Sequence, residues 1–183
     1  MKMATITATV LMTAVLTAGV RAEEKMHVQP DVAAEIMPVE QDKPLVQMAI
    51  LLDTSGSMSG LIDQARTELW AIVNEFIFAR RNGRTPEVQV GLYEYGKSSL
   101  AKDDGYIRQI VPLTTDLDKV SAELFALKTN GGSEYCGWVI KDATEGLQWS
   151  ENPGDLKVIF IAGNEPFTQG PVDYRDACKA AIN

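Results

Sequence analysis

Residues 45–59 read LVQMAILLDTSGSMS, an apolar run that ends in an acid followed by hydroxyl-rich residues. The unbroken apolar segment 48–52 is typical of a strand that is covered on both faces in a parallel sheet. Asp53, Ser55 and Ser57 follow at a spacing of two, and a long helical pattern comes after them. Polar side chains therefore gather where a strand ends and a helix begins, which is where ligands bind in open α/β sheets.

Strand and helix patterns alternate along the rest of the chain. Apolar residues recur at intervals of three and four through 61–81, which predicts an amphipathic helix of about five turns. Further strands are predicted at 88–95, 106–113 and 158–162, and further helices at 116–127, after 133 and at 173–183. The short gap between the second and third strands permits an antiparallel hairpin, because a parallel crossover needs more chain. This order predicts an α/β, doubly wound, mostly parallel sheet with one antiparallel strand and helices on both faces.

The composition is that of an ordinary globular protein with an acidic balance. The chain has 183 residues, of which 45% are apolar and 23% charged, so we expect one domain with a substantial core. The formal net charge of −8 argues against nucleic acid, whose phosphates require a basic patch, and against an anionic membrane surface. It favours metal cations or basic partners.

The first 22 residues resemble a secretory signal peptide. Lys2 provides a basic start, an apolar stretch follows, and Val20-Arg21-Ala22 offers small residues at both positions required before a cleavage site. An uncleaved membrane anchor is the alternative. We expect export to the periplasm or the extracellular surface, with no membrane insertion of the mature chain. Residues 23–44 contain three prolines and the only histidine, which predicts an exposed linker before a domain at 45–183.

Two cysteines, Cys136 and Cys178, bear on the redox compartment. In an oxidising compartment the two can form a disulfide, and two free buried thiols are the alternative. Two cysteines without a nearby histidine do not make a zinc site.

The oxygen donors of Asp53, Ser55 and Ser57 suit magnesium, manganese or calcium rather than zinc or copper. One carboxylate and two hydroxyls do not complete an octahedral shell, but loops 131–134 and 163–165 reach the same rim. A cation held mainly by neutral hydroxyls and waters keeps most of its charge, and it attracts a carboxylate of a binding partner as its sixth ligand. The residues thus predict a metal-dependent adhesion surface.

Asp53-Thr54-Ser55-Gly56-Ser57 resembles the D-x-S-x-S motif of von Willebrand factor A (VWA) domains, the core of that family's metal-ion-dependent adhesion site, or MIDAS. The resemblance covers residues 45–183. It implies Mg²⁺, or Mn²⁺ or Ca²⁺, bound by Asp53, Ser55 and Ser57. Ser133, in a Gly-Gly-Ser loop, stands in the place of the family's metal-binding threonine. The resemblance further implies a protein partner that supplies an acidic residue.

The last loop departs from the family pattern. The family has T-D-G after the fourth core strand, with an aspartate that supports the metal, whereas this chain has Ala162, Gly163 and Asn164. The sequence leaves open whether Asn164, Glu165 or Glu134 takes over that role. Loss of the charge predicts a weaker metal affinity. The family fold also has one more strand and helix, so we expect a C-terminally truncated domain with an exposed sheet edge.

Two other classes of function compete with adhesion. A metal-independent interaction scaffold is one, because acids and serines also cap turns. A magnesium-dependent phosphohydrolase is the other; an aspartyl phosphotransferase is disfavoured, because it would want a second acid where Ser55 stands. A serine hydrolase is disfavoured, because Met58 occupies the nucleophile position of G-x-S-x-G and His27 lies in the linker. The sequence therefore predicts a protein that is not an enzyme.

Overall fold

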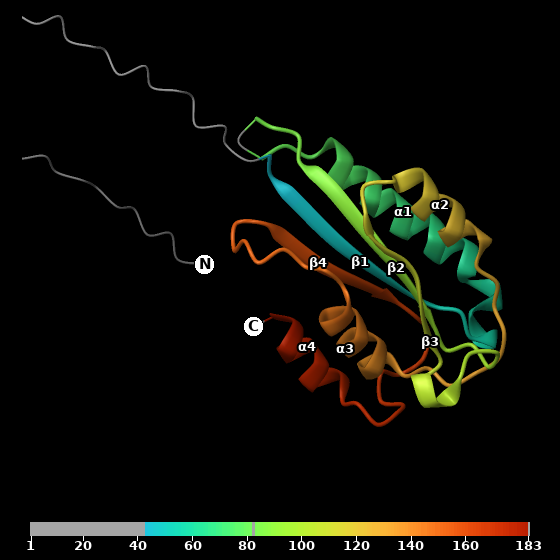
Figure 1. Ribbon diagram of the computed structural model, residues 1–183. Coiled ribbons are helices and arrows are strands. Elements are labelled where there is room, and N and C mark those ends of the chain that lie inside the picture. Colours follow the sequence, from blue (N-terminus) through green and yellow to red (C-terminus); the bar gives the residue numbers. More distant parts are fainter. Residues whose placement is uncertain (1–42, 82, 183) are drawn as a thin grey trace, which may run out of the picture. The chain divides into compact units, whose positions relative to one another are not determined.

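The computed structural model describes residues 43–81 and 83–182 (Figure 1). The predicted signal peptide and all but the last two residues of the predicted linker lie outside this described part. Within it, no helix combines the length and the apolar character that a membrane span requires.

The core of the fold is a four-stranded sheet with the strand order β3-β2-β1-β4. Its strands are β1 (Leu45–Asp53), β2 (Glu87–Tyr95), β3 (Ile107–Thr114) and β4 (Leu156–Ala162). Strand β1 pairs in parallel with β2 and β4, and β3 pairs antiparallel with β2. The predicted α/β class, the mostly parallel sheet and the antiparallel hairpin strand are thereby confirmed.

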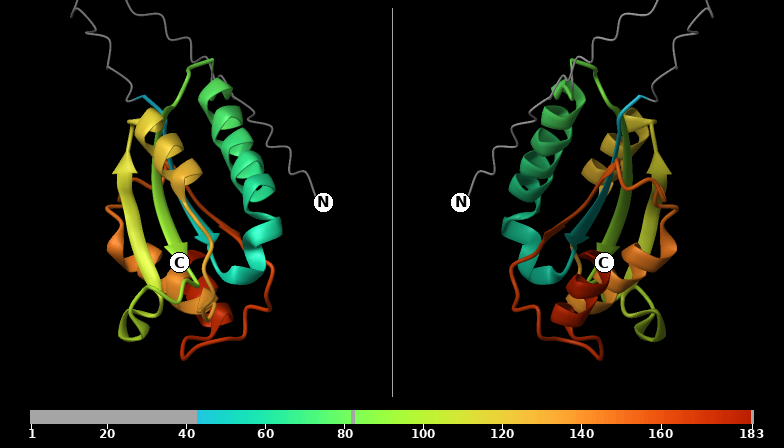
Figure 2. Two further views of the ribbon diagram at one scale, coloured as in Figure 1. Left: turned by 90° about the vertical axis from the view of Figure 1, so that its right-hand side faces the viewer. Right: turned by 90° about the vertical axis from the view of Figure 1, so that its left-hand side faces the viewer.

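Helices cover both faces of the sheet (Figure 2). They are α1 (Ile62–Phe78), α2 (Leu117–Ala126), α3 (Cys136–Gly146) and α4 (Tyr174–Ile182). Met48, Ile50 and Leu52 of β1 pack in the core layer with α1 and α2, and Ala49 and Leu51 pack with α3 and α4. All five are 0% exposed, and burying each larger side chain stabilises the fold by about 1.5–3 kcal/mol. The apolar run of β1 is thus explained by contact with two helical layers.

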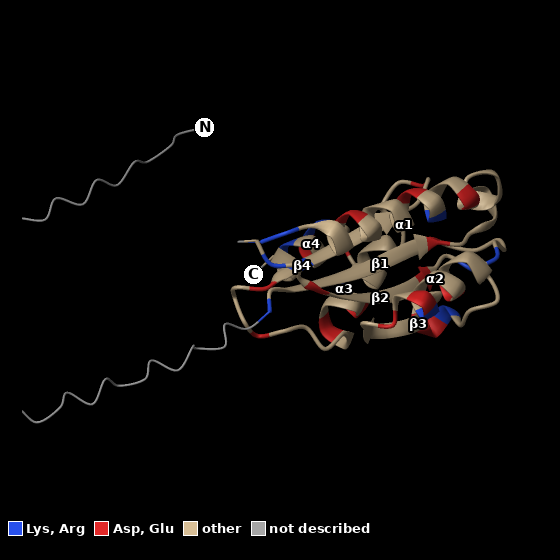
Figure 3. Ribbon diagram, turned by 90° about the horizontal axis from the view of Figure 1, so that it is seen from above, with Lys and Arg blue, Asp and Glu red and all other residues tan. Residues whose placement is uncertain are grey.

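Charged residues of the two central strands stand at the strand ends, as the charge-coloured view shows (Figure 3). Strand β1 has one charged residue, Asp53, at its last position. Strand β2 has Glu87 at its first position and Glu94 next to its last. The middle of the sheet is therefore apolar, and carboxylates lie where the strands reach the loops.

Helix α1 is shorter than the predicted span of 61–81. It ends at Phe78, and Ala79 is extended with φ −60° and ψ 153°. Ile77 is the last residue of the helix that packs against the core, while Phe78 is 80% exposed. Without further buried contacts the helix stops, and Arg81 forms an isolated antiparallel bridge with Arg84. Helix α2 is capped by Asp116, whose side chain accepts the Lys119 N–H at 3.0 Å.

The two cysteines lie on α3 and α4 and are free thiols. Cys136 is buried, which raises the pKa of its thiol to about 12, and the proximity of Cys178 adds to the rise. At neutral pH the Cys136 thiol is therefore neutral and packs as a small apolar side chain.

Candidate metal centre

The site lies where β1, β2 and β4 end. In the sheet register Asp53 is opposite Tyr95 of β2, and Leu52 is opposite Ala162 of β4. Gly163, the next residue after β4, consequently flanks Asp53 from the other side. The parallel strands thus bring three loops together at the carboxyl edge of the sheet (Figure 1).

Asp53 is fully buried, with one carboxylate oxygen satisfied and one not. Its Oδ1 accepts the Ser55 N–H at 2.8 Å, whereas Oδ2 has no hydrogen-bond partner among the described residues. Burial raises the pKa of Asp53; hydrogen bonds from Ser55 oppose the rise, and the carboxylates of Glu134 and Glu165 add to it. Buried acceptors are normally paired, and an unpaired one costs about 1–3 kcal/mol. An oxygen of this kind is a binding position for a cation or for its bound water.

The two serine hydroxyls lie side by side in front of Asp53. Their Oγ atoms are 3.0 Å apart. Neighbouring ligands of an octahedral Mg²⁺, each about 2.1 Å from the ion, are separated by about 3.0 Å. Ser55 is 1% exposed and Ser57 is exposed, so one hydroxyl faces the protein and the other the solvent. The spacing and the chemistry of these donors fit a hard cation.

Asn164 is attached to this pair. The Ser57 hydroxyl donates to Asn164 Oδ1 at 3.0 Å, and Asn164 Nδ2 donates to the Ser57 carbonyl at 3.3 Å. Asn164 is one of the three residues that the sequence left open at this position. It holds Ser57 in place with a neutral amide.

Thr54 fixes the turn between Asp53 and Ser55. Its N–H donates to the Tyr95 carbonyl at 2.9 Å, and its carbonyl accepts the Asn130 N–H at 2.9 Å. The single hydrogen of its hydroxyl is shared between Glu94 Oε2 at 3.3 Å and the Tyr95 carbonyl at 3.2 Å. The motif is therefore tied to β2 on one side and to the loop between α2 and α3 on the other.

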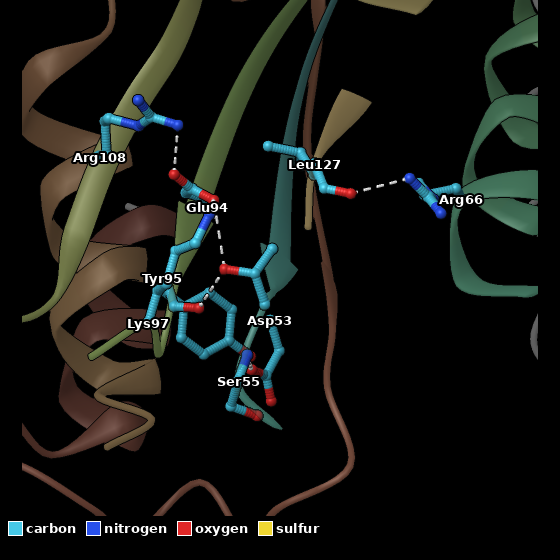
Figure 4. Close-up of polar contacts among 9 residues, drawn as sticks. Asp53, Ser55, Arg66, Glu94, Tyr95, Lys97, Arg108 and Leu127 are labelled. Carbon is cyan, nitrogen blue, oxygen red and sulfur yellow. Dashed lines mark hydrogen bonds and ion pairs between the residues drawn. The ribbon is translucent and has the colours of Figure 1, made fainter. Parts of the chain in front are cut away.

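Glu94 is a buried charge that supports this turn (Figure 4). It is 0% exposed and forms ion pairs with Arg108 at 2.5 Å and Lys97 at 3.3 Å. Arg108 of β3 pairs with Glu94 Oε1, and Lys97, in the loop that follows β2, pairs with Oε2, which also accepts from the Thr54 hydroxyl. The sequence offered no signal for this cluster, because the cluster depends on the antiparallel register between β2 and β3.

The loop between α2 and α3 is held against the motif at several points. Arg66 of α1 donates to the Leu127 carbonyl at 3.0 Å (Figure 4). Ser98 donates its N–H to the Gly131 carbonyl. A β-carbon on Gly56 would lie 3.2 Å from the Gly131 Cα, so the two backbones are in close contact. These contacts place the Gly-Gly-Ser sequence beside the D-x-S-x-S turn.

This loop presents two candidate ligands, Ser133 and Glu134. Ser133 is half-buried, and in the described ranges its hydroxyl makes none of the hydrogen bonds that fix the loop. Glu134 is 8% exposed and is held by Gln169, whose Nε2 donates to Glu134 Oε2 at 2.6 Å. The Glu134 N–H also donates to Gln169 Oε1 at 3.4 Å. The role of Ser133 stays a prediction, and Gln169 is a residue that sequence reasoning missed because no motif marks it.

Gly163 has no room for a side chain. A β-carbon there would lie 2.6 Å from the Tyr95 hydroxyl oxygen and 3.2 Å from Asp53 Oδ2. Tyr95 is 1% exposed, and burial raises the pKa of its hydroxyl far above the ordinary value, so it remains a neutral phenol. The tyrosine thus fills the space that an aspartate on this loop would need.

Across residues 43–81 and 83–182, no group of three or more histidine, cysteine or acidic side chains is placed to hold a metal ion. The donors at the strand ends are hydroxyls and carboxylates, which hard cations prefer.

No protein-family model and no curated protein matches the sequence. The structure, by contrast, matches solved structures. The VWA domain of SpRpn10 superposes with a TM-score of 0.51 at 18% identity, over 69% of this chain and 63% of that one. Proximal thread matrix protein 1 (PTMP1) from the mussel byssus, which has a zinc-occupied MIDAS motif, superposes with a TM-score of 0.58 at 16% identity, over 76% of this chain and 36% of that one.

This chain has the VWA fold. The resemblance seen in Asp53-Thr54-Ser55-Gly56-Ser57 is thereby confirmed at the level of the fold. The matched part spans less than two thirds of each of these solved chains. It also spans 15% of the pilus adhesin SpaC from Lactobacillus rhamnosus GG, which matches at a TM-score of 0.49 and 19% identity.

Proposed function

We propose that this VWA domain is an exported, non-enzymatic adhesion module that binds a protein partner in a metal-dependent way. Asp53, Ser55 and Ser57 hold Mg²⁺, or Mn²⁺ or Ca²⁺, and Ser133 adds a fourth oxygen. The partner supplies an acidic side chain to the remaining position. The observation that carries this proposal is the buried, unpaired Oδ2 of Asp53 in the same turn as two hydroxyl oxygens that are 3.0 Å apart.

The chemistry follows from which of these groups carry charge. When bound, the cation supplies an electrophilic position for a carboxylate. Asp53 provides a negative charge from the buried side, while Ser57 and Asn164 provide neutral oxygen and amide groups on the exposed side. An approaching carboxylate therefore meets the neutral Ser57 and Asn164 first, and the nearby negative charge of the half-buried Glu165 opposes its approach.

The proposed location rests on the signal-like pattern of residues 1–22. With residues 23–44 as a linker, the domain at 45–183 would stand free in the periplasm or on the cell surface. An adhesion module suits such a location. The acidic net charge is compatible with it, because we expect the mature chain neither to bind nucleic acid nor to insert into a membrane.

The proposal is tested by thermal unfolding of the purified protein in EDTA and in excess Mg²⁺ or Mn²⁺. A ligand that binds only the native state at 100 times its Kd adds about 2.7 kcal/mol, which raises the Tm of a domain of this size by about 10 °C. We expect this rise in the natural protein and its absence in Asp53→Ala. An unchanged Tm in every metal would refute the metal role and leave a metal-independent scaffold.

The phosphohydrolase alternative is separated by chemistry. We expect no release of nitrophenol from p-nitrophenyl phosphate with Mg²⁺ present. Release that is lost in Asp53→Asn would overturn the assignment as a non-enzymatic module.

A further inference from the structure

We propose that Glu134 supplies the second carboxylate of this metal centre and that Gln169 is the residue that positions it. The inference rests on the proposed metal-dependent function. The family pattern places a supporting carboxylate in the loop after β4, where this chain has Gly163. We infer that the loop between α2 and α3 supplies that negative charge instead.

The first support is the packing of three side chains around Gly96. This glycine has φ +82°, a conformation that residues with a β-carbon rarely adopt. A β-carbon there would lie 2.8 Å from Asp53 Oδ1, 3.3 Å from Glu134 Cγ and 3.4 Å from Ser55 Cβ. Glu134 therefore lines the same wall of the site as the two leading residues of the motif.

The second support is the electrostatic situation of Glu134. It is 8% exposed and lies beside the buried Asp53 carboxylate at the wall formed around Gly96. In the part of the chain that the structure describes, no salt bridge reaches Glu134; the nearby cations Lys97 and Arg108 pair with Glu94 instead. Two buried carboxylates close to one another are unfavourable without a cation. Asp53 Oδ2, on the side of Gly163, also has no hydrogen-bond partner among the described residues.

The third support is that the other candidates are less well placed. Gly163 is excluded by the Tyr95 hydroxyl, which occupies the position of a side chain. Glu165 is half-buried, whereas Glu134 is 8% exposed. Glu134, in contrast, is oriented by two hydrogen bonds with Gln169, at 2.6 and 3.4 Å.

The test measures Mn²⁺ binding by calorimetry in four variants of the purified protein. Glu134→Gln keeps the shape and removes the charge, and we expect a 10–100-fold weaker Kd, the range seen when outer partners of metal ligands are changed. Gln169→Ala keeps the Glu134 carboxylate but removes the side chain that orients it, and it should weaken Mn²⁺ binding about tenfold. Glu165→Gln is the matched control and should change the Kd by less than about threefold. Asp53→Ala should abolish binding.

A second readout separates a role in metal binding from a structural one. In EDTA, Glu134→Gln should have a Tm at least as high as that of the natural protein, because it removes repulsion between two buried carboxylates. A purely structural residue would lower both the Tm and the metal affinity. Gln169→Ala keeps the inference testable where Glu134→Gln does not fold.

Three outcomes overturn the inference. If the natural protein binds no Mn²⁺, the proposed function and this inference fail together. If the natural protein binds Mn²⁺ and Asp53→Ala does not, but Glu134→Gln binds as the natural protein does, only the inference fails. The inference also fails if Glu165→Gln weakens binding more than Glu134→Gln does.

Discussion

Replacing Asp53 by asparagine should make the metal-free protein more stable while it removes the response to metal. The carboxylate is 0% exposed, and its Oδ2 has no partner among the described residues. Asparagine keeps Oδ1 as the acceptor for the Ser55 N–H, which lies at 2.8 Å, and it carries no charge into the interior. The change therefore removes a buried, partly unpaired charge and leaves the backbone contact intact.

The expected gain follows from the single unpaired oxygen. An unsatisfied buried polar atom costs about 1–3 kcal/mol. The new Nδ2 of asparagine itself needs an acceptor. The Tyr95 hydroxyl is a candidate, because the Tyr95 hydroxyl oxygen and Asp53 Oδ2 both lie close to the position that a β-carbon on Gly163 would take. We take the net gain as about 1–2 kcal/mol, which corresponds to about 4–8 °C in Tm for a domain of this size.

The measurement is urea and thermal unfolding in EDTA, followed by the same scans in excess Mg²⁺. Asp103→Asn is the control, because Asp103 is an exposed acid in the short 3₁₀ helix η2 (Lys102–Asp104), and its loss changes the net charge equally. We expect the control to stay within about 0.5 kcal/mol of the natural protein. An Asp53→Asn protein that is less stable than the natural one in EDTA would refute the reasoning, since it would mean that the carboxylate is fully satisfied without metal.

Three further changes test other parts of the structure. Gly163→Asp should destabilise the protein by about 1–3 kcal/mol in urea unfolding, the usual cost of overpacking, because the new β-carbon would lie 2.6 Å from the Tyr95 hydroxyl oxygen. Adding Tyr95→Phe removes that oxygen and should recover part of the lost stability. Arg66→Met should cost about 2 kcal/mol in the same assay, because it removes the donor to the Leu127 carbonyl and leaves that carbonyl unpaired. Asp142 is an exposed residue of α3 whose folded-state pKa is raised by partial desolvation and by neighbouring acids, so the stability that its protonated form contributes is lost as pH rises through that pKa. Asp142→Asn should therefore raise stability at neutral pH and not below about pH 3.8, by a small amount because solvent screens the charge. An equal effect of Asp142→Asn at both pH values would contradict this assignment.

The central strand and the motif could be predicted from sequence because their signals are local. The run 48–52 is apolar throughout because it contacts helices on both faces, and this alone indicates a buried parallel strand. The end of α1 could not be predicted in this way. Arginine has good helix propensity, so the pattern appeared to continue, but packing against the core stops at Ile77.

The composition of the site was only partly predictable. Asp53, Ser55 and Ser57 lie within five residues, so their proximity follows from the chain itself. The fit of Tyr95 over Gly163 depends on the register that places Tyr95 opposite Asp53, and no local pattern encodes that register. The same holds for Gln169, which lies 35 residues from Glu134 in sequence and contacts it only in the folded chain.

The distribution of charge around the centre has a consequence for what can bind there. In the family pattern, the supporting acid lies in the loop after the fourth core strand. This chain has Gly163 and Asn164 in that loop, and the neutral Asn164 side chain is hydrogen-bonded to the exposed Ser57. With Glu134 as the second carboxylate, both coordinating negative charges lie on the protein side, at 0% and 8% exposure, while Ser57 and Asn164 on the solvent side are neutral and the half-buried Glu165 follows them. The total charge that attracts a cation is then retained, while the repulsion felt by an incoming carboxylate is reduced, because Coulomb energy falls with distance and with solvent screening. A centre built in this way favours an anionic group of a partner over a neutral one.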